Sequence, residues 1–600
     1  MKGVHCAMRK TLIAHLKSFF FDKIIFMALT KKQKNFINQN FEQISIKDIS
    51  KILKCTENDI LEYLKKDNPS NSRAGKKKGS KKSIFEENRY DYKTLREVLE
   101  ENLGFFVIIT VFLLALYWPS LNSILLSDEI TTYNTGILSK TVTLQSSFYS
   151  TVFVHVLNFF LFGLNGFGFR IVTLILHVVN IILFFYIFRN FFNETVLKIS
   201  IVLLSAHSLI SESIIWISAN PYVYMLTLYL ISCAFSLKFK EQKKYIYLIG
   251  SFIPIFILTL SGGHSNFAPL FLIFFNLFIL KNSFKKELLF TFWLLFLIPV
   301  YGLLNRSTVE QRVASLTTGP YLEKFTQTLP FTVAKSLELV IFPYNLALFH
   351  EETLTPEYYF FARAVTILFI VSFIILFIKN RFYFGILSLG FIYNIYMFSP
   401  IQISWFVAER YLYFTIFIYC LFLGILINYI YEDKQKEIAY FLLATFFVFL
   451  VFRTVTRFDD WKTNVNLWMS NVKIAPDSHR VRNNLADSLT KEGRFSEAEE
   501  HFIYSIKINP NFAEAYMNLG NSYLQQGKFP QAEQVYLKSL ELNSGLVDSY
   551  LNLGIIYANS KEFSKAYSTI DKVIQIAPNF EQAKVIKKEI EKYENSLKKN

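Results

Sequence analysis

Two adjacent carboxylates, Asp128 and Glu129, follow the first long apolar segment of the chain. A carboxylate at such a boundary can take a proton from a hydroxyl group or hold a metal ion. An adjacent acidic pair also occurs in ordinary solvated loops, so the pair alone leaves these roles open. We treat Asp128 and Glu129 as candidate catalytic residues. The four scattered cysteines exclude a cysteine-based zinc site, and no metal ligands are assigned.

Further polar residues lie in or beside later apolar segments, where a charge is costly and commonly functional. Arg410 and Tyr411 open one such segment in the sequence AERYLYF. A guanidinium matches phosphate oxygens bidentately, which makes Arg410 a candidate for binding phosphate. An arginine at a membrane boundary can also be a snorkelling anchor. His177, Glu212 and His264 are candidate supporting residues.

The composition indicates what must position these residues. The chain is 52% apolar and 18% charged, whereas a soluble domain carries about 25% charge. This excludes a disordered chain and disfavours a purely soluble enzyme. We predict an all-α fold with a polytopic helical membrane domain over residues 103–453, and an interfacial helix over 147–163. The domain has about eleven predicted spans: 104–125, 168–189, 198–217, 219–237, 245–260, 265–280, 287–304, 361–379, 382–400, 411–430 and 438–453.

Lysine and arginine predict the sidedness of this domain. Lysines 76–82 precede the first span, and every second loop thereafter is basic, whereas the breaks at 217–220, 261–264 and 401–408 hold no lysine and no arginine. We therefore expect a cytoplasmic N-terminus and a C-terminal region in the periplasm or in a lumen. The formal charge of +16 then reports sidedness, and no nucleic-acid partner is expected.

The C-terminal region is periodic. Asn484, Asn518 and Asn552 recur every 34 residues, each followed by leucine and a small residue. This period resembles the tetratricopeptide (TPR) repeat, whose stacked helix pairs form an α-solenoid with a concave groove for proteins or peptides. We predict three repeats over 477–578, a capping helix and tail over 579–600, and a connector over 454–476. A passive structural appendage is the alternative.

The N-terminal region, residues 1–102, is polar and basic. Residues 30–66 have helical periodicity and a pattern like a helix-turn-helix, followed by a basic linker. A small cytosolic helical module without a DNA target is favoured over a DNA-binding domain.

Several of these features, taken in order, resemble one family. The acidic pair, GFGFRIVTLILHVVN at 166–180, HSLISESIIWIS at 207–218, AERYLYF at 408–414 and RTVTRFDDWKTNVNLW at 453–468 lead into the repeats. In this order the chain resembles the transmembrane and TPR repeat-containing proteins, whose membrane part is a GT-C glycosyltransferase. It departs from that family at Asn220, where an arginine is usual, and at residues 261–264, where a Lys-Glu pair is usual.

The resemblance implies a protein O-glycosyltransferase. It implies transfer of a sugar, mannose or another hexose, from a polyprenyl- or dolichyl-phosphate donor to Ser or Thr of a protein held by the repeats. Asp128 and Glu129 match the family's acidic motif, and Arg410 and Tyr411 match a pair expected to contact the donor phosphate. A requirement for a divalent metal is left open. The implied location is the bacterial inner membrane or the endoplasmic reticulum.

Two other classes of function are compatible with the residues. A non-enzymatic membrane-anchored TPR scaffold for envelope protein assembly needs no acidic loop. A transporter is disfavoured, because the spans carry few charges and no inverted repeat of broken helices is evident.

Overall fold

The computed structural model describes residues 93–123, 161–163, 165–261, 267–285, 287, 291–304, 321–348, 350, 356–394, 407–433, 435–577 and 580–599. These residues are mostly helical, and the pairing of extended segments among them is one antiparallel bridge between His350 and Val407. The all-α prediction is confirmed for the described part of the chain. The predicted interfacial helix at 147–163 (apart from residues 161–163) and the module at 30–66 lie outside it.

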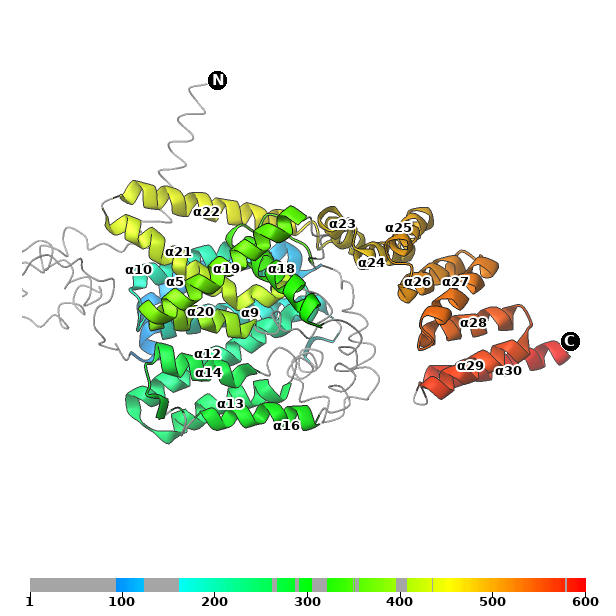
Figure 1. Cartoon of the computed structure of the whole chain (residues 1–600), viewed down its shortest axis with the longest axis horizontal. Helices are drawn as coiled ribbons and strands as arrows, with labels where there is room; N and C mark the ends of the chain where they lie inside the picture. The colour runs from blue at the N-terminus through cyan, green and yellow to red at the C-terminus, as the bar shows by residue number, and fades with distance from the viewer. Residues whose placement is uncertain are drawn as a thin grey trace, which may run out of the picture.

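The described chain forms a block of helices followed by a helical array (Figure 1). The α-helices of the block are α5 (Leu95–Leu121), α9 (Gly166–Phe188), α10 (Glu194–Ala206), α11 (Ile210–Ile215), α12 (Asn220–Gln242), α13 (Tyr245–Ser261), α14 (Ala268–Phe274), α16 (Leu297–Leu304), α18 (Tyr321–Ile341), α19 (Pro356–Lys379), α20 (Arg381–Tyr393), α21 (Tyr413–Glu432) and α22 (Lys436–Arg457).

Six helical segments of the described residues are long and apolar enough to cross a membrane. They are Leu95–Leu121, Gly166–Phe188, Ile217–Gln242, Glu357–Lys379, Glu409–Glu432 and Lys436–Arg457. Three shorter apolar helices, Tyr245–Thr259, Ala268–Ile279 and Arg381–Tyr393, overlap three other predicted spans. The count of about eleven spans stays a prediction.

The predicted continuous span at 198–217 is wrong in its secondary structure. α10 ends at Ala206, and His207 takes an extended conformation before the short helix α11. The imidazole Nε2 of His207 lies 3.2 Å from the carbonyl oxygen of Val340, so this polar side chain bonds to another segment at the break. Sequence hydropathy alone did not reveal the break, because it averages over the apolar residues of α10 and does not register a contact with a distant segment.

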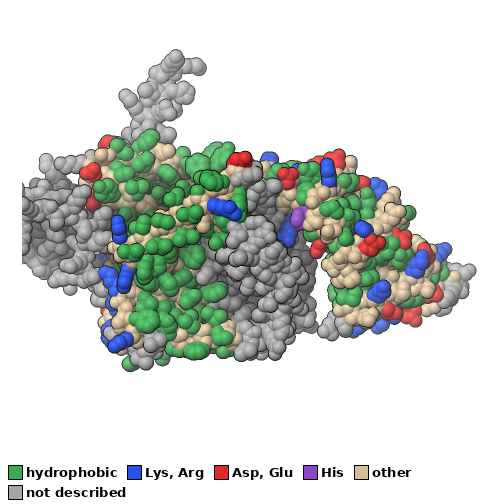
Figure 2. All heavy atoms as spheres, viewed as in Figure 1, with side chains coloured by type: hydrophobic (Ala, Val, Ile, Leu, Met, Phe, Trp, Pro, Cys, Tyr) green, Lys and Arg blue, Asp and Glu red, His purple; other side chains and the backbone are tan. Residues whose placement is uncertain are grey.

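The helices of the block run between two ends. At the end that we call the array end, α22 finishes at Arg457 and leads into the array, and α9, α12 and α21 begin. At the opposite end, which we call the basic end, the helix termini and turns carry many cations. These include Lys93, Arg189, Lys198, Lys240, Lys243, Lys244, Lys281, Lys379, Arg381 and Lys436. Figure 2 shows many lysine and arginine side chains gathered at the edge of the block away from the array.

Between these ends the surface of the block is strongly apolar (Figure 2). α19 is the clearest case, with Phe360 77% and Ile378 74% exposed, and α22 exposes Phe441. Large contiguous apolar surface on a folded protein marks contact with a membrane or with another protein. The block therefore has a surface that a membrane or another protein would cover.

The array consists of three helix pairs and a final helix. The pairs are α24 (His479–Lys491) with α25 (Phe495–Ile508), α26 (Ala513–Gln525) with α27 (Phe529–Leu542), and α28 (Val547–Asn559) with α29 (Phe563–Ile576), and the final helix is α30 (Glu581–Lys599). The predicted connector holds a further helix, α23 (Asn464–Ile474), which packs on α24.

Glycines of the array lie at tight turns and at a close helix crossing. Gly493 and Gly527 have φ of 77° and 72° in the turns within the first two pairs, a conformation that glycine adopts without strain. Lys561 takes φ of 63° at the equivalent turn of the third pair. Gly520 allows close crossing, because a Cβ atom there would lie 2.6 Å from a ring carbon of Tyr536.

Candidate functional site

The structure describes four of the seven residues that the sequence singled out. Arg410, Tyr411, Glu212 and His177 belong to the block, whereas Asp128, Glu129 and His264 lie outside the described residues. The roles assigned to all seven stay predictions. The four described residues can be placed relative to one another.

Arg410 and Glu212 form an ion pair, although they are far apart in the sequence. The guanidinium NH1 of Arg410 donates to Glu212 Oε1 at 2.7 Å. Glu212 is fully buried, and Arg410 is 8% exposed. A buried pair of this kind has to compensate the loss of hydration of both ions, which demands good geometry and further polar neighbours.

Aromatic rings complete the surroundings of Arg410. Its guanidinium carbon lies 4.7 Å from the ring centre of Trp216 and 4.8 Å from that of Tyr411, within the range of cation–π attraction. The Tyr411 hydroxyl also lies 3.5 Å from NH2. Arg410 and Tyr411 are therefore in contact, and Glu212 belongs to the same cluster of side chains.

Local structure explains this arrangement. Glu409–Leu412 form a tight 3-10 turn, η9, that starts α21, and the preceding Val407 pairs with His350. The short helix α11 presents Glu212 toward η9, and the chain turns at Trp216 into α12. Arg410 and Glu212 therefore lie on short helical elements at the array end, between the long helices.

A second buried ion pair adjoins the first, and sequence reasoning missed it. The guanidinium of Arg457 lies 3.3 Å from Glu409 Oε1 through NH2 and 2.7 Å from Asp460 Oδ2 through NH1. NH1 also donates to the carbonyl oxygen of Leu346 at 2.9 Å, and the imidazole of His350 lies 3.9 Å from Glu409. The i,i+3 spacing of Arg457 and Asp460 was the available signal for half of this network.

This second pair connects the candidate site to the array. Glu409 precedes Arg410 in the chain, and Arg457 ends α22 just before the connector. Trp461, fully buried, lies beneath the same guanidinium, whose carbon is 5.3 Å from the ring centre. The array is thereby anchored beside η9.

His177 lies in a separate polar cluster. Its Nδ1 is 2.6 Å from the Tyr413 hydroxyl, and Asn180 Nδ2 donates to that hydroxyl at 3.4 Å and to the carbonyl oxygen of Val223 at 3.0 Å. All four residues are buried. The described structure does not bring His177 into the Arg410–Glu212 pair, so the expected supporting role has no direct contact behind it.

No group of three or more His, Cys, Asp or Glu side chains that could hold a metal ion occurs among the described residues. Because Asp128 and Glu129 are not among them, this finding does not bear on the acidic pair. The described site residues offer a cation that is paired with a carboxylate and lined by aromatic rings.

The array carries its own polar surface along the first helix of each pair. Asn518 Nδ2 donates to Asn483 Oδ1 at 3.1 Å, and Asn552 Nδ2 donates to Asn521 Oδ1 at 2.8 Å. Tyr536, from the second helix of its pair, donates to Asn521 Oδ1 at 2.6 Å. These asparagines sit at or near the positions that recur every 34 residues.

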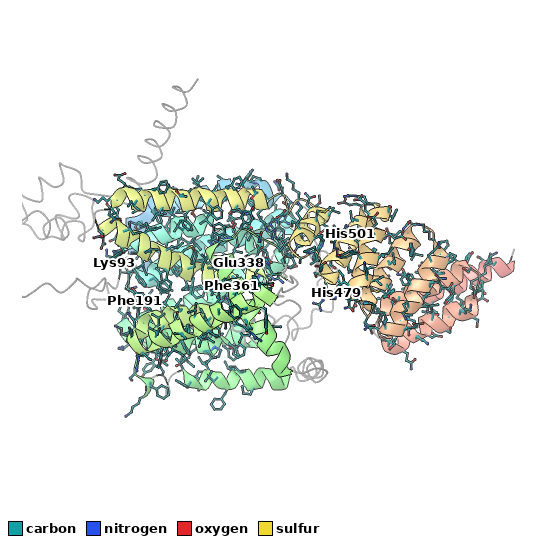
Figure 3. All side chains as sticks on the ribbon, turned by 45° about the horizontal axis from the view of Figure 1, so that its top comes forward. Lys93, Phe191, Glu338, Phe361, His479 and His501 are labelled. Carbon is teal, nitrogen blue, oxygen red and sulfur yellow. The ribbon has the colours of Figure 1, made fainter. Side chains whose placement is uncertain are left out.

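Titratable groups of the array are perturbed by partial burial. Burial lowers the pKa of His501 below its ordinary value, and the Arg482 guanidinium, whose NH1 lies 3.1 Å from His501 Nδ1, adds to the effect. Burial likewise lowers the pKa of His479, with help from Arg480. Figure 3 labels both histidines, which lie at the part of the array nearest the block.

Comparison with known proteins identifies the array. Three family models match: a TPR repeat over residues 486–527, and tetratricopeptide repeats over residues 513–546 and 547–580. The C-terminal region is a tetratricopeptide-repeat array. The sequence prediction of repeats is confirmed.

Two solved structures are also similar to part of this chain. A crystal structure of MamA shares 22% identity and covers 24% of this chain and 90% of its own, with a TM-score of 0.20. A crystal structure of YrrB, described as a TPR protein with an unusual peptide-binding site, shares 18% identity and covers 27% of this chain and 88% of its own, with a TM-score of 0.21. No curated protein matches the chain.

Proposed function

We propose that this protein is a membrane glycosyltransferase that moves a hexose from a polyprenyl-phosphate donor to a Ser or Thr hydroxyl of a protein held by the TPR array. One observation carries the proposal. A buried arginine, walled by Trp216 and Tyr411 and paired with Glu212, lies at the end of an apolar helical block where a protein-binding repeat array begins. The resemblance of the acidic loop and the AERYLYF segment to GT-C enzymes supplies the reaction class.

The two ends of the block support a membrane location and its sidedness. Lysines and arginines concentrate at the basic end, and the array leaves from the other end (Figures 1 and 2). Because cytoplasmic ends of membrane helices carry the excess of lysine and arginine, the basic end is cytoplasmic in this proposal. The array and Arg410 are then on the periplasmic or lumenal side.

Arg410 acts on the donor in this proposal. The donor phosphate stays at the membrane boundary, and its ester oxygen leaves with the electron pair of the bond to the sugar. A guanidinium in a water-poor site stabilises the negative charge that develops there. The phosphate takes the place of the Glu212 carboxylate beside NH1, or binds the guanidinium edge that faces Tyr411.

Asp128 acts on the acceptor. A serine or threonine hydroxyl is a weak nucleophile, so a positioned carboxylate takes its proton while the oxygen attacks the anomeric carbon from the face opposite the phosphate. The products are an inverted glycoside, a free polyprenyl phosphate and protonated Asp128. Glu129 supports Asp128 in this scheme.

The array supplies the acceptor. Asn518, Asn521 and Asn552, which are partly exposed, give amide donors and acceptors that suit the backbone of an extended peptide. Binding of the acceptor beside η9 raises its effective concentration at the site, so a weakly nucleophilic hydroxyl is presented repeatedly to the donor. The buried Arg457–Glu409 pair holds the segment that leads into the array beside η9, which keeps the bound acceptor near the proposed site.

The test is transfer in proteoliposomes that contain the full chain and a polyprenyl-phosphate hexose, with acceptor proteins from the same source. Mass spectrometry should detect a hexose on Ser or Thr that is lost in Arg410→Gln. Arg363→Gln is a matched control, because Arg363 also stacks on a tyrosine, Tyr359, with 4.3 Å to the ring centre, on α19. Equal transfer by Arg410→Gln and Arg363→Gln contradicts the proposal. Activity with and without a chelator settles the metal requirement.

A scaffold without enzymatic activity is the second candidate, favoured by the TPR matches taken alone. It predicts that full-length Arg410→Gln and Asp128→Asn proteins recruit the same partners and fully replace the wild type in cells. A loss of cellular function in both variants, with partner recruitment unchanged, contradicts the scaffold.

A further inference from the structure

Arg170 is a fully buried cation in the first turns of α9 that the proposed chemistry does not use. Its Nε donates to the carbonyl oxygen of Ile215 at 2.7 Å. Its NH1 donates to the carbonyl oxygens of Ser123 at 2.5 Å and Leu121 at 3.3 Å. One side chain therefore joins three backbone carbonyls from two segments that are distant in the sequence.

The positions of these carbonyls explain why a cation is stable there. Leu121 is the last residue of α5, and Ile215 is the last residue of α11. The final carbonyls of a helix lack partners within that helix and carry partial negative charge, so they favour a nearby cation. Arg170 itself lies near the start of α9, where the dipole of its own helix disfavours a cation. Its placement therefore serves α5 and α11 more than α9.

Both segments lead to residues of the candidate site. Asp128 follows Ser123 by five residues in the sequence, and Glu212 precedes Ile215 by three, about one helical turn. Glu212 in turn binds Arg410 at 2.7 Å. Arg170 thus holds the exit of α5, from which the acidic loop departs, against the helix that carries the partner of Arg410.

We propose that Arg170 is a positioning residue for the transfer reaction, which fixes Ser123, five residues before Asp128 in the sequence, relative to the Arg410–Glu212 pair. This inference rests on the proposed function for its catalytic consequence. The geometric part, a clamp between the end of α5 and the end of α11, stands on the described contacts alone.

Loss of the clamp should leave the block folded, because other contacts hold the same helices together. Phe106 of α5 packs edge-on against Phe185 of α9 at 5.4 Å, in the part of the pair far from the clamp. α11 stays attached through Glu212 and through its packing on α12. We therefore expect a local change at the array end.

The kinetic test compares Arg170→Met, Arg170→Lys and the control Ser232→Ala. Met keeps much of the volume of Arg170 without donors, and Lys keeps the charge but cannot reach all three carbonyls. Ser232→Ala also removes a buried side-chain hydrogen bond to a backbone carbonyl, that of Ser251 at 2.7 Å, but between α12 and α13.

We expect kcat of Arg170→Met to fall about 100-fold, since a displacement of about 1 Å in a reacting group costs that much. KM for the donor should change less than about threefold, because Arg410 still binds the phosphate. Arg170→Lys should recover part of kcat, and Ser232→Ala should keep the wild-type kcat. An unchanged kcat in Arg170→Met, or equal losses in Arg170→Met and Ser232→Ala per folded molecule, overturns the proposal.

A second measurement does not depend on any transferase activity. Ser123, half-buried just after α5, is replaced by cysteine in a chain whose Cys6 and Cys55 are serine, while Cys233 and Cys420 are buried. A membrane-impermeant maleimide should label Ser123→Cys at least about threefold faster when Arg170 is methionine, because the segment opens locally and uncovers the side chain. Unchanged labelling overturns the clamp. Faster labelling in a protein that transfers no sugar overturns the proposed function and keeps the clamp.

Discussion

The apolar block and the TPR array differ in where their ion pairs lie. The array keeps its ion pairs at the surface, as in Lys491–Asp487 and Lys538–Glu541, where water screens them. The block buries Arg410–Glu212 and Arg457–Glu409, whose side chains are 9% exposed or less. Surface pairs contribute little to stability, whereas a buried ion that loses its partner is strongly destabilising. Each buried charge of these two pairs therefore depends on its partner to remain stable in the block.

This difference has a consequence for function. The array presents repeated, modest contacts along an extended surface, which suits recognition of a polypeptide. The block concentrates paired opposite charges at one end, where we propose that the donor phosphate binds. The two regions meet at Arg457, Glu409 and Trp461, so the proposed donor and acceptor sites share a buried junction.

The largest expected effect separates the chemistry of the block from recognition by the array. In Asp128→Asn, we expect transfer to fall by about three orders of magnitude, because a general base contributes about 10²–10⁴ to the rate. Binding of acceptor protein, measured by pull-down with the full chain, should not change. The measurement is initial rate of hexose transfer in proteoliposomes.

Glu357→Gln is the control for Asp128→Asn, since Glu357 is an exposed carboxylate in the first turn of α19. It should transfer at the wild-type rate. If Asp128→Asn keeps more than a tenth of the wild-type rate, Asp128 is not the base and the acidic loop has another role.

The next effect contrasts buried and exposed ion pairs directly. Arg457→Met leaves Glu409 buried without its guanidinium partner, and we expect the free energy of unfolding to fall by about 3–5 kcal/mol. Lys491→Met removes an exposed pair with Asp487 and should cost at most about 1 kcal/mol. Denaturant unfolding of the purified protein in detergent measures both values.

A double variant sharpens this comparison. Arg457→Met combined with Glu409→Gln removes both charges, so part of the loss should be recovered. Equal destabilisation by Arg457→Met and Lys491→Met is the result that contradicts a buried network at the junction.

The array was more predictable from the sequence than the block. A 34-residue period fixes which residues pack, because each repeat contacts mainly its neighbours. The recurrence of Asn484, Asn518 and Asn552 was sufficient to place three helix pairs. The turn at Lys561 departs from the glycine pattern without changing the fold.

In the block, the sequence predicts the long helices but not the contacts between them. Apolar runs located the long helices, whereas the break at His207 depends on a contact with Val340, which is 133 residues away. The sequence indicates Arg410 and Tyr411 as candidate residues but does not indicate their surroundings. The pairing of Arg410 with Glu212 and the neighbouring Arg457–Glu409 pair arise from tertiary packing, which one sequence does not encode by any local pattern.

A smaller effect tests whether an added Cβ atom destabilises a close helix crossing in the array but not an open position on the block. In Gly520→Ala, the added Cβ lies 2.6 Å from Tyr536, whose hydroxyl is held by Asn521, so we expect a loss of about 1–3 kcal/mol. Gly104 lies within α5, and no heavy atom lies within 4 Å of a Cβ built there. Gly104→Ala should therefore stabilise the protein by about 0.5–1 kcal/mol. Thermal unfolding followed by circular dichroism measures both changes, and a stabilising Gly520→Ala contradicts the crossing argument.

The smallest expected effect is a pH dependence confined to the array. The pKa values of His479 and His501 are lowered in the folded array, chiefly by burial, so protons bind the unfolded chain more readily. Their stabilising contribution is complete above the ordinary histidine pKa of about 6.5 and is lost as pH falls below that value toward the folded pKa. The melting temperature of the array should therefore decrease between pH 7.5 and pH 5.5.

Replacement of both histidines separates this cause from acid effects elsewhere. His479→Gln combined with His501→Gln should flatten the decrease in melting temperature, since glutamine keeps a polar side chain at each position and does not titrate. The cations Arg480 and Arg482 remain and carry the same charge at both pH values. A decrease of unchanged size in the double variant would place the titrating groups outside these two histidines.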